Sequence, residues 1–185
     1  LIELLTGSVT EQEANLLYIA VTTDTGCFQY ANTNAATLRA AARLLELGAD
    51  NRKVSMEFFR KISRARMALV GHIYSGMRFF RGGQIAIAVV TRALIDALQA
   101  TEDDCDDIAG LPGRADGVVV SVTIRELTDG RSKISVRTTP EVDSCAICAV
   151  YGGGGHKMAS GCTLTCDPET AVEKILAAID QVWPA

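Results

Sequence analysis

The strongest constraint on the fold is a stretch of alternating apolar and polar residues on both sides of a short turn. The segment "GVVVSVTIREL" is followed by "TDG" and then by "RSKISVRT", over residues 117–138. Alternation of this length predicts two β-strands, each with one buried face. The Asp129-Gly130 pair between them predicts a tight turn. We therefore expect an antiparallel β-hairpin.

The length of the loop decides the register of this hairpin. A two-residue loop would place Ile124 opposite Ser135 and so mix apolar with polar residues on one face. A three-residue loop with Gly130 in the left-handed conformation pairs Ile124 with Ile134 instead. We expect the second register, because it separates an apolar face from a polar one.

The polar face of the predicted hairpin carries hydroxyl groups and cations. Arg125 lies opposite Lys133 in the expected register, and like charges in direct opposition destabilise a sheet, so this pair indicates an anionic partner. An ordinary solvated sheet face is the alternative. The candidate substrate-binding residues of this face are Arg125, Lys133, Ser135 and Arg137.

A run of four glycines comes later in the chain, in "YGGGGHKMASG" at residues 151–161. Backbone N–H groups of a glycine-rich turn can point inward and form an anion-binding nest, which a phosphate can approach because no Cβ atoms intervene. A flexible linker is the alternative, but a predicted helix precedes the run and a predicted strand follows it. The candidate binding residues here are Gly152, Gly153, Gly154, Gly155 and His156.

An aspartate stands among hydroxyl residues in "TTDTG", residues 22–26, where the first predicted helix ends. Asp24 is either a turn residue or a hard oxygen ligand for Mn²⁺ or Mg²⁺. The spacing alone favours the turn, and a single carboxylate does not make a metal site.

Helices and strands alternate in the remaining sequence. A capping box at Thr10 starts one helix, and "AATLRAAARLLEL" (residues 35–47) forms the next. "QIAIAVV" is a strand, Thr101 caps a helix in the acidic segment "EDDCDDIA", and Asp167-Pro168 starts the last helix. The second half is thus predicted to be an α/β unit. The second helix is expected to bury Leu38, Ala41, Ala42 and Leu45.

Composition excludes several classes of protein. The net charge of −4 argues against a generic nucleic-acid coat. The sequence contains no run of about 18 apolar residues, which a membrane-spanning helix would need. Six cysteines are too few for a disulfide scaffold, and their spacing with His156 matches no common zinc site. Reduced cysteines suit a cytoplasmic protein. The opening "LIELLTG" is typical of a helix end, so we expect a chain that starts partway through a longer protein.

Several of these segments together resemble the DHH phosphoesterase family. "YIAVTTDTGCFQYANT" is similar to the Asp-Thr-Gly segment of its catalytic domain. "VSVTIRELTDGRSKISVRT" and "VDSCAICAVYGGGGHKMASGCT" are similar to its DHH-associated C-terminal domain. The branch that the chain resembles is the bacterial oligoribonuclease and 3′-phosphoadenosine 5′-phosphate phosphatase type.

This resemblance implies an α/β fold with three parts. Residues 1–50 would be the C-terminal remnant of an α/β catalytic domain, residues 51–82 a helical linker, and residues 83–185 the substrate-binding domain, a mixed β-sheet with flanking helices. The family's other metal-binding motifs, Asp-x-Asp and Asp-His-His, do not occur before Asp24.

The resemblance also implies an activity for the intact protein. It would be a phosphoesterase with two Mn²⁺ ions that hydrolyses short RNA or a nucleotide phosphate, with Asp24 as a metal ligand and catalytic residue. The hairpin arginines, the glycines and His156 would grip the substrate. This chain alone would hold no ions and be inactive. A noncatalytic nucleic-acid-binding module and a cyclic dinucleotide phosphodiesterase are the alternatives. No membrane partner is expected, and a homodimer is an open option.

Overall fold

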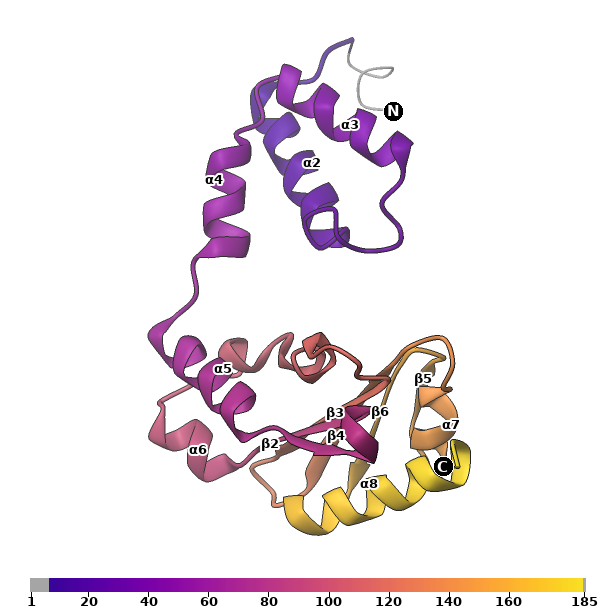
Figure 1. Ribbon diagram of the computed structural model, residues 1–185. Coiled ribbons are helices and arrows are strands. Elements are labelled where there is room, and N and C mark those ends of the chain that lie inside the picture. Colours follow the sequence, from indigo (N-terminus) through magenta and orange to yellow (C-terminus); the bar gives the residue numbers. More distant parts are fainter. Residues whose placement is uncertain (1–6, 185) are drawn as a thin grey trace. The chain divides into compact units, whose positions relative to one another are not determined.

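The computed structural model describes residues 7–184, so the expected helix end within residues 1–6 lies outside the described part. The chain forms two compact units, Leu1–Ile62 and Ser63–Ala185, which are coloured indigo to magenta and magenta to yellow in Figure 1. Within residues 7–184, every helix is too short or too polar to traverse a bilayer.

The described part of the first unit is helical. Helix α2 (Glu11–Asp24) begins with the predicted capping box: the Glu13 N–H donates to the Thr10 hydroxyl at 3.3 Å, and the Thr10 N–H donates to the Glu13 carboxylate at 2.8 Å. Helix α3 (Ala35–Glu46) follows, and α4 (Asn51–Ser55) continues into the π-helical turn η1 (Met56–Arg60). The buried apolar residues of this unit are Ala14, Tyr18, Ala41, Leu44, Ala49 and Val54.

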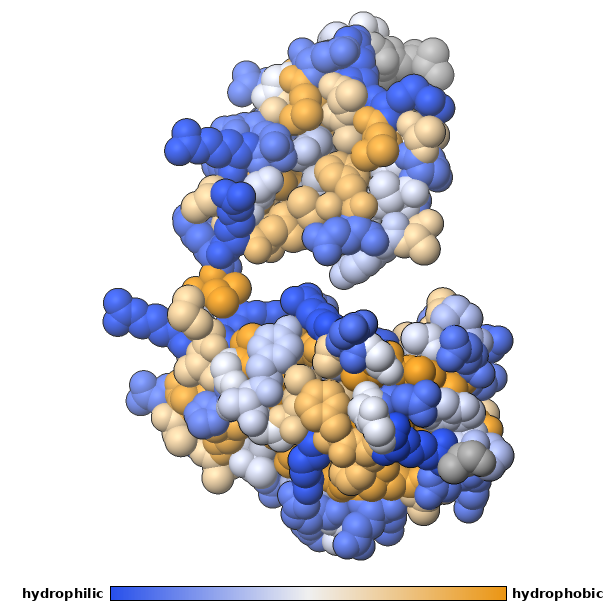
Figure 2. All heavy atoms as spheres, viewed as in Figure 1, coloured by the Kyte–Doolittle hydropathy of each residue, from blue (hydrophilic) through white to orange (hydrophobic). Residues whose placement is uncertain are grey.

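The predicted buried face of α3 is wrong in part. Ala41 is buried as expected, but its partner in the core is Leu44, whereas Leu38 and Leu45 are exposed; Ala42 is exposed too. Apolar residues occur on more than one side of this helix, so spacing alone does not select the side that packs. Figure 2 shows the resulting apolar side chains, in orange and tan, on the visible surface of this unit.

The second unit is built on one six-stranded mixed sheet, which confirms the predicted α/β class. The strand order is β1-β2-β3-β4-β6-β5, with β2 and β3 parallel and all other neighbours antiparallel. The strands are β1 (Arg78–Phe80), β2 (Ile85–Val90), β3 (Val120–Glu126), β4 (Ser132–Thr138), β5 (Gly154–His156) and β6 (Ala159–Leu164).

Helices flank this sheet on both sides. On one side α7 (Ser144–Ala149) and α8 (Pro168–Val182, yellow in Figure 1) complete the main core with the apolar residues of β3 and β4. On the other side α5 (Arg64–Gly76) and α6 (Arg92–Ala97) pack with Ala88 and Val90 of β2 in a smaller cluster. The polar face of the hairpin lies on this second side, because Ala88 is in register with Thr123.

The hairpin has the register expected from a three-residue loop. Ile124 pairs with Ile134, and Arg125 pairs with Lys133. The Leu127 N–H donates to the Arg131 carbonyl at 2.7 Å, and Gly130 has a φ of 78°. The other pairs are Val120–Thr138, Ser121–Arg137, Val122–Val136, Thr123–Ser135 and Glu126–Ser132.

The boundary between the two units falls within the segment 51–82 that the sequence predicted to be a helical linker. Residues 51–62 belong to the first unit. Helix α5 buries Leu69 and Ile73 in the second unit, and β1 pairs with β2. The two buried side chains are four residues apart and so share one face of the helix. The second half of the predicted linker is therefore part of the second unit.

Three of the four consecutive glycines are explained by the backbone and by packing. Gly152 has a φ of 71° just past the end of α7, as is common after helices. A Cβ on Gly153 would lie 2.4 Å from the Gly161 carbonyl oxygen, and one on Gly155 would lie 2.6 Å from the Ala159 carbonyl oxygen, whereas a Cβ on Gly154 would meet no atom within 4 Å.

Gly153→Ala should therefore destabilise the protein, and Gly154→Ala should not. Overpacking typically costs about 1–3 kcal/mol, so we expect a loss of this size for Gly153→Ala in urea-induced unfolding. Gly154→Ala is the matched control and should change the free energy of unfolding by under about 0.5 kcal/mol. Equal stability of both variants would contradict the packing explanation.

Candidate functional site

A cavity of about 220 Å³ lies over the polar face of the hairpin; we call it cavity A. On the hairpin side it is lined by Thr123, Arg125, Lys133, Ser135 and Arg137, and on the opposite side by residues 105–109. The four hairpin residues that the sequence analysis selected therefore line one cavity. They do so because the register places their side chains on the same face of adjacent strands.

Arg125 already has an anionic partner within the protein. Its Nη1 donates to the Glu102 carboxylate at 2.7 Å; the Arg125 side chain is 17% exposed, and that of Glu102 is 70% exposed. Burial acts to lower the pKa of Arg125, but the hydrogen bonds to Glu102 and Cys105 outweigh it and raise that pKa above its ordinary value. The anion that the Arg125–Lys133 opposition indicated is thus in part a protein carboxylate.

Two further cations of cavity A keep their charge available. Among residues 7–184, neither Lys133 nor Arg137 forms an ion pair with a carboxylate. Arg137 donates from Nη1 to the Val136 carbonyl at 3.0 Å, which uses one of its five N–H groups. With the Ser135 and Thr123 hydroxyls between the cations, the cavity can bind an anion with several oxygen acceptors.

Residues 105–109, which form the opposite wall of cavity A, belong to two short turns in and just after the acidic segment 102–107. Sequence analysis predicted a helix here, but the chain forms the 3₁₀ turns η3 (Asp103–Cys105) and η4 (Ile108–Gly110), separated by Asp107 at a φ of 58°. A left-handed residue interrupts an α-helix. The Thr101 cap is present, because the Asp104 N–H donates to the Thr101 hydroxyl at 3.3 Å.

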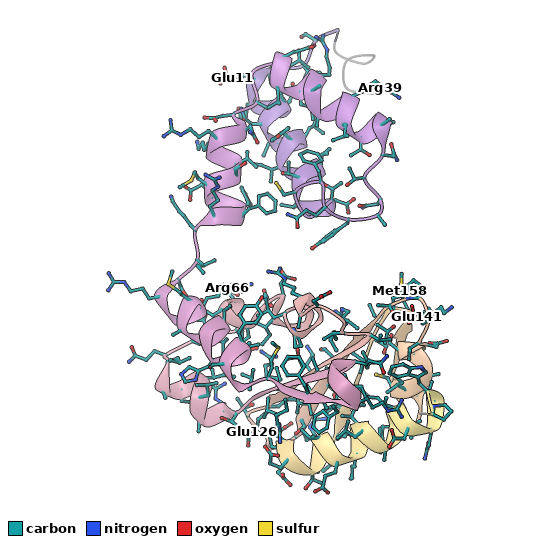
Figure 3. The ribbon with its side chains drawn as sticks, viewed as in Figure 1. Glu11, Arg39, Arg66, Glu126, Glu141 and Met158 are labelled. Carbon is teal, nitrogen blue, oxygen red and sulfur yellow. The ribbon has the colours of Figure 1, made fainter. Side chains whose placement is uncertain are left out.

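Asp104 holds this wall against the rest of the unit. Its carboxylate accepts hydrogen bonds from the hydroxyl of Ser63 and from the N–H and hydroxyl of Thr101, the last two at 2.9 and 3.0 Å. Arg66, which Figure 3 labels on α5, donates to the carbonyls of Asp103 and Asp104 at 3.3 and 3.2 Å. These contacts fix one side of the cavity before any ligand binds.

The glycine-rich segment and His156 lie on the same sheet but do not line cavity A. His156 is in register with Ala159, and Ala159 is in register with Arg137. Directly paired antiparallel residues point to the same face, so His156 and Arg137 share the polar face, two strand spacings of about 4.8 Å apart. The His156 side chain is exposed. The register thus brings both groups to one face; their roles in binding stay predictions.

Asp24 lies in the first unit, as the last residue of α2. The Asn32 amide donates to its carboxylate at 3.0 Å and to its carbonyl at 3.2 Å, which fits a turn residue. In residues 7–184, no group of three or more His, Cys, Asp or Glu side chains could hold a metal ion. The carboxylate suits a hard cation but supplies one ligand only. The catalytic and metal roles of Asp24 are still hypotheses.

Sequence reasoning missed one side of the site. Glu102 and residues 105–109 were assigned to a helix without a role, although an acidic run beside a cationic hairpin was a signal of contact. The pairing of Arg125 with Glu102 depends on the shape of the turn at η3, and residue spacing in the sequence does not predict that shape.

This geometry defines an α/β domain with a polar cavity on one face of a mixed sheet. Three cations and two hydroxyls line the cavity from the hairpin, and Asp106 and Asp107 line it from the opposite wall. Residues 82–183 match the family model described as the DHHA1 domain, so the chain belongs to the DHHA1 domain family. The match covers five of the six strands, all except β1, and both helices of the main core.

Several known proteins with similar sequences are named as oligoribonucleases and PAP phosphatases, and one is named as an A-adding tRNA nucleotidyltransferase. A Thermus thermophilus protein named bifunctional oligoribonuclease and PAP phosphatase NrnA is 36% identical over 181 residues, which are 97% of this chain and 53% of that protein. A Mycoplasma genitalium protein of the same name is 32% identical and matches 82% of this chain and 46% of its own length. The chain thus spans about half the length of these relatives.

One solved structure is similar throughout. It is an exopolyphosphatase-related protein from Bacteroides fragilis, with a TM-score of 0.85 and 25% sequence identity; the match covers 94% of this chain and 51% of that protein. The fold of the described residues is therefore also found in that protein.

The stabilising contribution of Asp104 should depend on pH. Hydrogen bonds, first from Ser63 and then from Thr101, lower the pKa of its carboxyl below the ordinary value. A lowered pKa in the folded protein contributes stability above the unfolded pKa of about 3.9, and this contribution is lost as pH falls through the folded pKa. Asp104→Asn should therefore unfold at a lower urea concentration than the wild type at pH 7, with the difference shrinking below about pH 3.9. A constant difference down to pH 2.5 would contradict this.

Proposed function

We propose that cavity A binds phosphate groups of short oligoribonucleotides or of 3′-phosphoadenosine 5′-phosphate, and that this chain is the substrate-binding part of a metal-dependent phosphoesterase. The observation that supports this most is the convergence of Arg125, Lys133 and Arg137 on one cavity in a chain whose net charge is −4. Cations gathered against an acidic background favour a local anion site over a general nucleic-acid coat.

The chemistry of the lining favours a phosphate. Guanidinium groups bind phosphate oxygens in pairs of parallel hydrogen bonds, and hydroxyls donate to the remaining oxygens. Lys133 supplies a mobile point charge beside the fixed Arg125. The names of the relatives, which describe action on oligoribonucleotides and PAP, support a nucleotide rather than a small carboxylate.

Catalysis in the intact protein would need divalent metal ions, which generate hydroxide near neutral pH and stabilise in-line phosphoryl transfer. We propose Mn²⁺ for this role and Asp24 as one ligand among several. The role of this chain would be to hold the substrate. Binding of the substrate's phosphates to cavity A would position the substrate for reaction and so raise the rate. His156, on the same face as Arg137, is the candidate for an additional contact.

Arg137→Gln should weaken binding of 5′-phosphorylated tetra-adenylate to this chain. A hydrogen bond to a charged group contributes about 1.5–3 kcal/mol, which corresponds to about 10-fold to 100-fold in Kd. Fluorescence anisotropy in EDTA over a series of salt concentrations gives both Kd and its salt dependence, which should be shallower in the variant.

The control is Lys174→Gln, which removes an exposed cation from α8, on the opposite side of the sheet. It should leave Kd unchanged. If the wild-type chain binds neither the tetranucleotide nor 3′-phosphoadenosine 5′-phosphate, the proposed function is wrong. Equal losses in both variants would indicate general electrostatic attraction instead of a site.

The 185-residue chain alone should not hydrolyse the same tetranucleotide with Mn²⁺, because Asp24 is a single carboxylate and a two-metal site requires several ligands. Product formation is followed by chromatography for the wild type and for Asp24→Ala. Both should match the protein-free rate. A clear turnover that survives Asp24→Ala would contradict the assignment of catalysis to this residue and its partners.

A further inference from the structure

A second cavity, of about 210 Å³, lies beside cavity A on the second unit; we call it cavity B. Arg137 lines both cavities, so they are neighbours on the polar face. Cavity B is otherwise lined by the turn that contains Gly110, Gly113 and Arg114, and by the start of β3 and the end of β4. The family resemblance and the proposed function assign no role to Arg114 or to this cavity.

The register of the hairpin sets the order of the two cavities along the strands. The Thr139 N–H donates to the Val119 carbonyl at 3.0 Å, one row beyond the Ser121–Arg137 pair. Cavity B lies over these two rows, whereas cavity A lies over the rows of Ser135 and Lys133. Successive rows on one face are two residues apart, about 6.7 Å, which is comparable with the separation of neighbouring phosphates in an extended strand of RNA.

Two groups in cavity B lack partners. Arg114 is exposed and forms no ion pair or side-chain hydrogen bond with any residue in the described range 7–184. The Thr139 hydroxyl oxygen is fully buried and also has no hydrogen-bond partner there. The Thr139 oxygen has almost no accessible surface, so an occupant of the cavity would not reach it directly. The exposed, unpaired guanidinium of Arg114 is the group that points to an anionic occupant.

The lining also has an apolar part. Val118 and Val119 are half-buried and line the cavity together with Gly110 and Gly113, which carry no side chains; Val119 also packs against the main core. A ligand that places an anionic group against Arg114 and Arg137 can thus place an apolar ring against the valines. A nucleotide has both parts, because its phosphate is anionic and its base has an apolar face.

We propose that cavity B is a second subsite, which binds the nucleotide unit next to the one held in cavity A. Arg137 would lie between the two bound nucleotides, and Arg114 would bind the phosphate of the second nucleotide. This inference rests on the proposed function, because it takes an oligoribonucleotide as the ligand of cavity A. Each cavity is smaller than the roughly 300 Å³ at which ordinary small-molecule pockets begin, which suits a chain of units better than one large ligand.

The two subsites predict a preference that depends on ligand length. A ligand with one nucleotide, such as 3′-phosphoadenosine 5′-phosphate, fills cavity A and makes no contact with Arg114. A tetranucleotide occupies both cavities and gains that contact. Arg114 therefore distinguishes oligoribonucleotides from mononucleotides, whereas Lys133, which lines cavity A only, serves both.

The test compares Arg114→Gln and Lys133→Gln with the wild-type chain in EDTA. Kd is measured for 5′-phosphorylated tetra-adenylate and for 3′-phosphoadenosine 5′-phosphate by isothermal titration calorimetry. We expect Arg114→Gln to raise Kd for the tetranucleotide about 10-fold and to leave Kd for the mononucleotide unchanged. Its salt dependence for the tetranucleotide should fall by about 0.7 in log–log slope, the value for one phosphate of a single strand. Lys133→Gln should raise both Kd values.

The outcomes separate this inference from the proposed function. If Arg114→Gln binds both ligands as the wild type does while Lys133→Gln weakens both, cavity B is not a subsite, although cavity A still binds phosphate. If Arg114→Gln weakens both ligands equally, length discrimination by cavity B is wrong. If the wild type binds neither ligand, the proposed function fails first. Arg114 is exposed and unpaired, so its substitution should leave the urea midpoint unchanged, and this is checked in parallel.

Discussion

The turn from Leu127 to Arg131 is the constraint on which both the core and the site depend. Its three-residue loop, closed by the hydrogen bond from the Leu127 N–H to the Arg131 carbonyl, selects the register of β3 on β4. A slip of one residue would turn the side chains of a strand to the other face. Arg125 would then face the apolar side under α8, where an unpaired charge is costly. The core and the cationic cavity are thus two faces of one register.

Only one of the three cations on this face forms an ion pair within the described part of the protein. Glu102 pairs with Arg125, but the Glu102 side chain is mostly exposed, and exposed ion pairs contribute only about 0–1 kcal/mol. Lys133 and Arg137 form no ion pair with a carboxylate in the described part of the chain, although Asp106 and Asp107 line the opposite wall of the cavity. An arriving phosphate can share Arg125 with Glu102, since a guanidinium has five N–H groups, or replace Glu102 at small cost. Arg125 is therefore held in place and still open to a ligand.

The sequence predicted those features that depend on local pattern. Alternation and loop length gave the hairpin and its faces, and cap residues gave the starts of α2 and α8. Features that depend on distant partners were not predictable in this way. Strand β1 has three residues and exists by pairing with β2. The buried side of α3 was wrong because apolar residues lie on more than one of its sides.

In the candidate site, too, the residues set by local pattern could be predicted from the sequence, and those set by distant contacts could not. The four hairpin residues follow from the alternation, so they could be selected together without coordinates. Residues 105–109 could not, because their position depends on Asp107 in the left-handed region and on the hydrogen bonds of Asp104 to Ser63 and Thr101. These are side-chain contacts between segments far apart in sequence. Cavity B was missed for the same reason, since Arg114 reaches the face from a 3₁₀ turn, η5 (Pro112–Arg114), without periodic pattern.

The glycine run shows how one sequence feature can satisfy two requirements. A Cβ on Gly153 or on Gly155 would collide with β6, so these positions allow close packing of the edge strand. Gly154 lies between them and is in register with Gly161, which is in register with Ser135 of cavity A. Side chains are therefore missing from the polar face at the next two positions from Ser135 toward the edge strand, and bare main chain extends from the cavity in that direction. Packing accounts for Gly153 and Gly155, whereas Gly154 keeps this part of the surface open.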